Sequence, residues 1–407
     1  MRVLPTYPKE VKVFLLASLI NSTGSALMWP LTTMFVFDEL GHNMADAGLV
    51  ILIQALGGIV GQLLGGSLYH RVGVKKLIVG SLVLNAVGLF ALPVTSQFWY
   101  FYMALMGFIG FCNALSLPAI QAFIGFRFAD RRGELFNIVY VANNIGVALG
   151  TALSGFLADI SYKLTFIANG LTSAVFAVFF LIYLNRLDDE QGEVHLDKKH
   201  TSTSGESMWR LLGNTRIYLY LGIGSMFILL GNSMWNSGVS PFIISEGFPK
   251  KAYGFLWTLN GILIFVAQPI ISLLKRWLAK SASSQMTMSA VFYLSSYIVI
   301  LITHNYPGLV LAMVLATLGE MLISPAIPAF ISDHAGRAAP FYIGLSGGVG
   351  AIGRVIGPYT MCLLYDGGGL IPVAWLATGT AVIGVVFFIV HAMQNRGNKS
   401  EIASSGV

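Results

Sequence analysis

The chain has 407 residues, of which 56% are hydrophobic and only 10% are charged. Soluble proteins carry about 25% charged residues, so this composition excludes an ordinary water-facing surface and indicates a protein that lies in lipid. The net charge of +6 could suggest nucleic acid, but the basic residues fall in short segments between apolar stretches, where they set membrane topology instead.

Apolar stretches long enough to cross a bilayer follow one another along the chain. A spanning helix needs about 20 apolar residues. The first stretch is too long for a cleavable signal peptide and is expected to be retained. The pattern predicts twelve spanning helices, at residues 12–36, 46–68, 75–95, 98–124, 134–158, 163–185, 215–244, 252–274, 286–304, 306–332, 339–365 and 370–394.

One long polar stretch divides these helices into two sets of six. It contains an acidic run followed by a Ser/Thr run. The fold expected is therefore an all-α membrane protein of two pseudo-symmetric six-helix bundles. Its parts are an N-terminal bundle at 1–185, a cytoplasmic linker loop at 186–214, a C-terminal bundle at 215–394 and a cytoplasmic tail at 395–407.

The positions of Lys and Arg predict the orientation. If the N-terminus is inside, 20 of the 24 basic residues fall in inside segments. The outside segments hold only Lys163, Lys250 and Lys251, and Arg354 lies within a helix. Basic residues concentrate on the cytoplasmic side of membrane proteins. We therefore expect both termini in the cytoplasm of a multi-pass protein of the cell membrane.

The two halves repeat each other. Residues 117–124 read Leu-Pro-Ala-Ile-Gln-Ala-Phe-Ile, and residues 324–331 read Ser-Pro-Ala-Ile-Pro-Ala-Phe-Ile. In this register Asn113 corresponds to Glu320, so only the second copy has a carboxyl group there. Many secondary transporters are built from such repeats, with the binding site where the repeats meet.

Residues 66–76 read Gly-Ser-Leu-Tyr-His-Arg-Val-Gly-Val-Lys-Lys and resemble GxLaDRxGRK, a loop signature of the major facilitator superfamily. The resemblance implies a cytoplasmic gate that latches the two halves. His70 stands where the family has Asp, so it can latch them only through a different bond, and a loop that only sets topology is the alternative. The gate residues implied are Gly66, His70, Arg71, Gly73, Lys75 and Lys76.

A second stretch resembles gxxxGPxxGG, a signature of the antiporter branches of that superfamily. Gly146, Gly150 and Gly155 match and are expected to pack helices, whereas Thr151 replaces the Pro. The segment around Glu320 also resembles the tenth helix of some proton-coupled multidrug exporters. The resemblance covers essentially the whole chain. It implies a secondary transporter, similar to the drug/proton antiporters, that exports lipophilic or cationic compounds in exchange for protons.

Glu320 is the sharpest chemical signal in the sequence. A carboxylate in the middle of a bilayer costs at least ~2.5–3.5 kcal/mol, so such residues usually face a cavity or a partner. Arg354, at a similar depth in the next helix, is the candidate cation. Glu320 and Arg354 could form a permanent ion pair, a pair that opens when Glu320 is protonated or substrate binds, or no contact at all. Asp38, near the first outside loop, is a candidate for proton entry, although a solvated role is the alternative. These three residues form the expected proton-coupling set.

Polar and aromatic residues suited to a substrate cavity recur in the paired helices. Apolar and aromatic walls with few polar groups accept lipophilic molecules, and aromatic faces attract cations. Each residue taken singly could instead serve packing. The candidates are Asn21, Trp29, Gln54, Asn113, Asn232, Trp235, Asn236, Asn260 and Gln268.

Other kinds of chemistry lack a signature in the sequence. There is no phosphate-binding loop, no metal-ligand spacing and no nucleophile–base pair. We therefore expect no enzyme, cofactor or metal. The partners expected are a small-molecule substrate, protons and the lipid bilayer, without nucleic acid, and the protein is expected to be a monomer. Two alternatives remain: a proton-coupled importer or facilitator of a small nutrient, and a non-transporting membrane sensor or scaffold.

Overall fold

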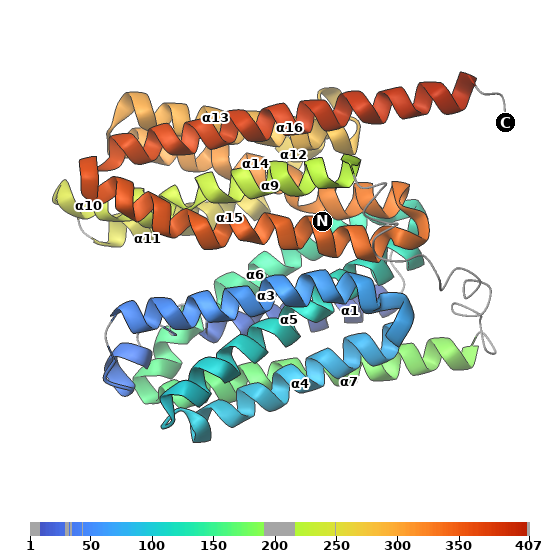
Figure 1. The fold of residues 1–407 in the computed structure, drawn as a ribbon, viewed down its shortest axis with the longest axis horizontal. Helices are drawn as coiled ribbons and strands as arrows, with labels where there is room; N and C mark the ends of the chain where they lie inside the picture. Colours follow the sequence, from blue (N-terminus) through green and yellow to red (C-terminus); the bar gives the residue numbers. More distant parts are fainter. Residues whose placement is uncertain are drawn as a thin grey trace. The chain divides into compact units, whose positions relative to one another are not determined.

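The computed structural model describes residues 9–28, 32, 35–42, 44–190, 216–248 and 250–404, and every regular element in them is helical (Figure 1). The all-α prediction is therefore confirmed. The long helices of the first half are α1 (Lys9–Met28), α3 (Met44–Val72), α4 (Val74–Thr95), α5 (Trp99–Arg127), α6 (Arg132–Ile160) and α7 (Tyr162–Glu190). The α-helices of the second half are α9 (Arg216–Asn232), α10 (Ser240–Ser245), α11 (Lys250–Val266), α12 (Gln268–Trp277), α13 (Ala282–Thr303), α14 (Tyr306–His334), α15 (Ala339–Gly368) and α16 (Leu370–Ser404).

Short helical segments complete the described chain. Two are π-helices, η3 (Phe35–Glu39) and η6 (Trp235–Val239), and two are 3-10 turns, η4 (Ala129–Arg131) and η7 (Gly336–Ala338). The η6 segment joins α9 to α10 within the single candidate span Arg216–Ser245. The predicted linker lies mostly outside the described residues. Helix α16 continues ten residues into the predicted tail, because its polar end keeps the helical conformation after the apolar part stops.

Eleven of the helices in the described residues are long and apolar enough to cross a membrane, and a bent pair brings the number to twelve. The pair joins α11 to α12 with a bend of 60°. Pro269, in the first turn of α12, lacks a backbone N–H and cannot continue the preceding helix. The Gln268 amide donates to the Ile264 carbonyl at 2.7 Å and so satisfies one backbone group at the break. The sequence had predicted a single helix, 252–274, here.

The chain forms two compact units. The first contains α1 to α7 except for the start of α6. The second contains α9 to α16 together with residues 131–137, which are the last residue of η4 and the first turns of α6. Within the second unit the Asn137 amide donates to the Gln268 side chain at 3.0 Å. Arg132 forms an ion pair with Asp333 at the end of α14. These two contacts explain why residues 131–137 group with the second unit.

Glycines allow close helix contact at equivalent positions of both units. In the first unit, a Cβ at Gly146 or Gly150 of α6 would collide with backbone carbonyls of α1. In the second unit, a Cβ at Gly353 of α15 would collide with the Met226 carbonyl of α9, and one at Gly357 would meet Ser233. The four glycines keep the 207-residue register of the repeat. Helices α6 and α15 therefore both use glycines to approach a neighbouring helix closely.

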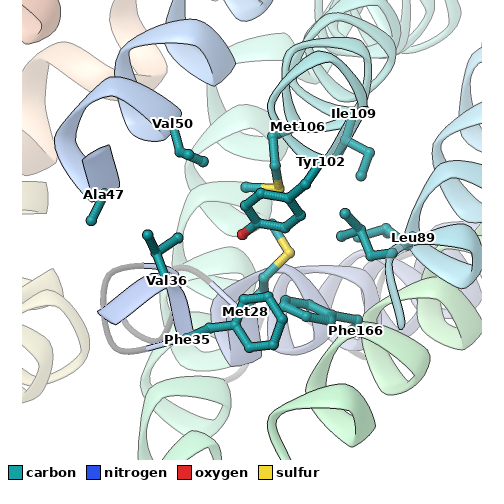
Figure 2. Packing of buried hydrophobic residues seen from close by; sticks show 11 residues of the cluster. Met28, Phe35, Val36, Ala47, Val50, Leu89, Tyr102, Met106, Ile109 and Phe166 are labelled. Carbon is teal, nitrogen blue, oxygen red and sulfur yellow. The ribbon is translucent and has the colours of Figure 1, made fainter. Parts of the chain in front are cut away.

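A compact apolar cluster holds one end of the first unit together (Figure 2). Six elements contribute to it: α1, η3, α3, α4, α5 and α7. Phe35 and Phe166 meet edge to face, with ring centroids 4.9 Å apart. This arrangement is favoured by the aromatic quadrupole. The cluster therefore ties η3, which carries Asp38, to the rest of the unit.

Candidate transport site

Glu320 lies at the midpoint of α14, 14 residues from Tyr306 and 14 from His334. By helix rise it is about 21 Å from either end. Its side chain is half-buried. The Asn260 amide of α11 donates to the Glu320 carboxylate at 3.3 Å and to the Thr317 hydroxyl at 3.0 Å. Two polar residues that the sequence singled out separately, Glu320 and Asn260, are thus in contact.

Tyr293 of α13 joins this group, although the sequence reading did not include it. Its side chain is only 3% exposed. Its phenol lies within electrostatic range of both Glu320 and Arg354. A tyrosine in an apolar helix looks like a packing residue in the sequence. The one available signal was the glycine at 319, which lies under the tyrosine ring.

Arg354 lies near the midpoint of α15 and its side chain is exposed. A cation halfway along a spanning helix is costly in lipid, so such a residue is expected to face water or a partner. The neighbouring Gly353 and Gly357 pack against α9. A direct contact between Arg354 and Glu320 stays a prediction.

The other candidates of the second unit lie on α9, η6 and α12. Trp235 is 1% exposed and thus packed inside the unit. Asn236 is exposed and accepts a hydrogen bond from the Tyr253 hydroxyl at 2.6 Å. Asn232 is half-buried, and Gln268 is engaged at the bend between α11 and α12. Their roles as substrate contacts remain predictions.

In the first unit, Asn113 lies at the midpoint of α5 as Glu320 does in α14, and its side chain is exposed. Asn21 and Gln54 are half-buried in α1 and α3. Trp29 lies outside the described residues, and the same holds for the side chain of Asp38.

A polar contact that the sequence reading missed joins α1 to α6. The Asn143 side chain accepts hydrogen bonds from Ser18 at 2.7 Å and from Ser22 at 2.9 Å. The signal for it was the serines spaced four apart in α1, which lie on one helix face.

The proposed gate motif forms the junction of α3 and α4. Gly66, His70 and Arg71 lie in the last turns of α3, and Lys75 and Lys76 lie in the first turn of α4. Gly73 links the helices with φ of 87°, a conformation that glycine adopts without strain. The glycine is therefore required by the turn itself. The latching role of the motif stays a prediction, as does the packing role of Gly155.

No group of three or more His, Cys, Asp or Glu side chains in the described part of the chain could hold a metal ion. In the second unit the Glu320 carboxylate and the Asn260 amide are in contact, and the buried Tyr293 phenol lies in electrostatic range of the carboxylate. Ionisable groups in the middle of spanning helices mark pathways for substrates, ions or protons. Fold and site together define a multi-pass helical membrane transporter.

Comparison with known proteins shows the family. The model of the Major Facilitator Superfamily matches residues 14–358, so the chain belongs to that superfamily. An uncharacterized MFS-type transporter of Bacillus subtilis (strain 168), YttB, is 31% identical over 365 residues, covering 89% of this chain and 90% of the relative. The quinolone resistance protein NorA of Staphylococcus aureus (strain MSSA476) is 23% identical over 405 residues, covering 97% of this chain and 99% of NorA.

A solved structure supports the same fold. The human organic anion transporter MFSD10 (TETRAN) superposes with a TM-score of 0.69 at 14% identity, covering 95% of this chain and 100% of that one. The protein is therefore a secondary transporter of the cell membrane with the major facilitator fold, and its family consists of transporters rather than enzymes.

Proposed function

We propose that the protein exports lipophilic or cationic compounds in exchange for protons, by alternating access, with Glu320 as the proton carrier. The observation that carries the proposal is the position of this carboxyl group. It lies half-buried at the midpoint of α14, with Asn260 donating to it and Tyr293 in electrostatic range. A group so placed can exchange a proton with water while remaining part of a substrate site.

The surroundings of Glu320 include some groups that favour its neutral form and others that favour its ionised form. Low-dielectric surroundings favour the neutral acid, whereas a hydrogen-bond donor and a nearby cation favour the carboxylate. Asn260 supplies the donor and Arg354 the cation. Both protonation states are then accessible, and a cationic substrate would compete with the proton for the same carboxylate. This competition is the simplest form of exchange.

The contrast between the halves supports a cationic or amphipathic substrate. Asn113 occupies the position that Glu320 has in the second half, and an amide carries no charge. The site is therefore acidic in one half only. The polar and aromatic candidates are proposed to contact the substrate, and Asp38 is proposed to take part in proton entry. The motif at 66–76 is proposed to act as a cytoplasmic latch, and the protein to act as a monomer. The name of NorA, a quinolone resistance protein, agrees with drug export.

The test uses purified protein in proteoliposomes with an acidic interior and tetraphenylphosphonium, a lipophilic cation, outside. Outward proton flow should drive accumulation of the cation. Glu320→Gln should abolish this accumulation while the variant remains folded, as judged by gel filtration and thermal unfolding. Glu246→Gln, an exposed acid after α10, is the matched control and should keep transport. Accumulation that persists in Glu320→Gln would refute the proposal.

Proton-coupled import is the second candidate. The observation in its favour is the altered antiporter signature, with Thr151 in place of the Pro. The same proteoliposomes distinguish the two directions. Accumulation driven by an acidic exterior, rather than an acidic interior, would show that the substrate moves with the proton.

A further inference from the structure

Tyr293 lies at the middle of α13, 11 residues after Ala282 and ten before Thr303. The side chain is 3% exposed and so is enclosed by the second unit. A buried tyrosine normally needs a partner for its hydroxyl, because an unpaired polar group is costly away from water.

The ring of Tyr293 lies against the backbone of α14 beside Glu320. A Cβ built on Gly319 would lie 3.0 Å from Cδ2 of Tyr293 and 3.0 Å from the Ser289 carbonyl oxygen. Any side chain at 319 would therefore push the ring away. Gly319 therefore allows the Tyr293 ring to lie against α14 at the residue before Glu320.

Two serines of α13 fix this contact from either side. The Ser289 hydroxyl donates to the Gly319 carbonyl at 2.6 Å, and the Ser296 hydroxyl donates to the Ala312 carbonyl at 2.7 Å. Both bonds are buried and both join α13 to α14. Tyr293 lies between the two serines, so its position relative to α14 is set by hydrogen bonds as well as by packing.

The phenol of Tyr293 lies within electrostatic range of Glu320 of α14, Arg354 of α15 and Tyr297, one turn further along α13. A phenol can donate one hydrogen bond and accept others. It is thus suited to donate toward a carboxylate and to accept from a guanidinium. One neutral group can in this way connect the acid of one helix to the cation of the next.

This set of groups belongs to the second half alone. Helices α4 and α13 have 22 residues each, and aligning them end to end matches Tyr293 with Asn85. The Asn85 amide is used elsewhere, because it donates to Ser173 of α7 at 3.1 Å. The first-half residues at the positions of Tyr293, Glu320 and Arg354 are Asn85, Asn113 and Val147.

From this arrangement we propose that Tyr293 is a positioning residue for proton coupling, whose hydroxyl links the charge state of Glu320 to Arg354. The inference rests on the proposed role of Glu320. With Glu320 ionised, the phenol donates to the carboxylate and presents its lone pairs to Arg354. When a proton from water neutralises Glu320, the phenol loses its charged acceptor and Arg354 loses its indirect partner. The helices α14 and α15 are then free to change their contacts.

The test compares Tyr293→Phe with Tyr102→Phe. Both tyrosines are buried, Tyr293 in α13 and Tyr102 in α5 of the other unit, and each change removes one hydroxyl. The readout is the pH profile of tetraphenylphosphonium transport in proteoliposomes, together with exchange of the cation without a gradient. Without the donor, Glu320 keeps its proton to higher pH, so the midpoint in Tyr293→Phe should rise by about one pH unit. Gradient-driven transport should fall while exchange remains, and Tyr102→Phe should follow the wild type.

A pH profile of Tyr293→Phe that coincides with that of Tyr102→Phe would overturn the inference. If Tyr293→Phe does not fold, site-specific 3-fluorotyrosine at 293 keeps the ring and makes the phenol a stronger donor. The midpoint should then fall, and an unmoved midpoint would again overturn the inference. If Glu320→Gln loses transport but the midpoint of the pH profile is unchanged in Tyr293→Phe, only the role of Tyr293 is rejected. Retained transport in Glu320→Gln would reject the proposed function itself.

Discussion

The Asn260 side-chain amide donates to the Glu320 carboxylate at 3.3 Å, and the same nitrogen donates to the Thr317 hydroxyl at 3.0 Å. Thr317 in turn donates to the Met313 carbonyl at 2.7 Å. The carboxylate is thus held by an amide that is itself held by α14.

Asn260→Asp would place a second carboxyl group next to Glu320. Two like charges at this separation cannot both be ionised easily, so the pair should retain a proton to higher pH. We expect the midpoint of the pH profile for transport to rise by about one unit or more. The matched control is Asn305→Asp, because an aspartate at the start of α14 can still cap the helix as Asn305 does. An unchanged midpoint in Asn260→Asp would argue against a functional contact.

Gly353→Ala tests the packing of α15 on α9. The added Cβ would collide with the Met226 carbonyl, which is backbone and cannot turn aside. Overpacking of this kind costs about 1–3 kcal/mol. We expect a lower thermal unfolding temperature in detergent. Gly379→Ala in α16 is the control, because no atom lies within 4 Å of its added Cβ. Equal unfolding temperatures for the two variants would show that close approach at Gly353 is not needed.

Gln268→Leu tests the bend between α11 and α12. The change removes the bond to the Ile264 carbonyl and the bond from Asn137 at a similar side-chain volume. A carbonyl left without its partner away from water costs about 1–3 kcal/mol. Thermal unfolding should therefore occur at a lower temperature. Gln97→Leu, an exposed loop glutamine, should unfold as the wild type does. A Gln268→Leu protein as stable as this control would mean that the bend does not depend on the side chain.

The ion pair of Arg132 with Asp333 should contribute little to stability. The two side chains are 17% and 47% exposed, so water and salt screen their attraction. A double-mutant cycle with Arg132→Gln and Asp333→Asn should give a coupling free energy of about 0–1 kcal/mol that decreases with added salt. A larger, salt-independent coupling would contradict the screened pair described here.

Much of the fold could be predicted from the sequence, because an uninterrupted apolar stretch indicates a spanning helix. The bend at Ala267 could not be located in this way, although Pro269 was its signal. The predicted end of α16 was also too early. Its last residues are polar, so the apolar pattern that indicates a spanning helix stops before the helix does. The repeated packing glycines were visible only in the first half, where Gly146 and Gly150 matched a known signature.

The site was predictable in part for a related reason. A lone acid in an apolar stretch is conspicuous because it is costly there, and Glu320 was identified by that cost. Asn260 was identified as polar, but its contact with Glu320 depends on the packing of two helices. Tyr293 carries no such cost in a sequence, since tyrosine is common in apolar helices. Its importance comes from Glu320 on another helix, and the residue pattern within one helix does not predict contacts with another.

The central claim, that Glu320 gives up a proton when a cationic substrate binds, can be measured without transport. Tetraphenylphosphonium is added to purified protein in weakly buffered detergent, and the released protons are detected with a pH-sensitive dye. The wild type should acidify the solution on binding, and Glu320→Gln should bind without releasing protons. Equal proton release from the two proteins would contradict the account.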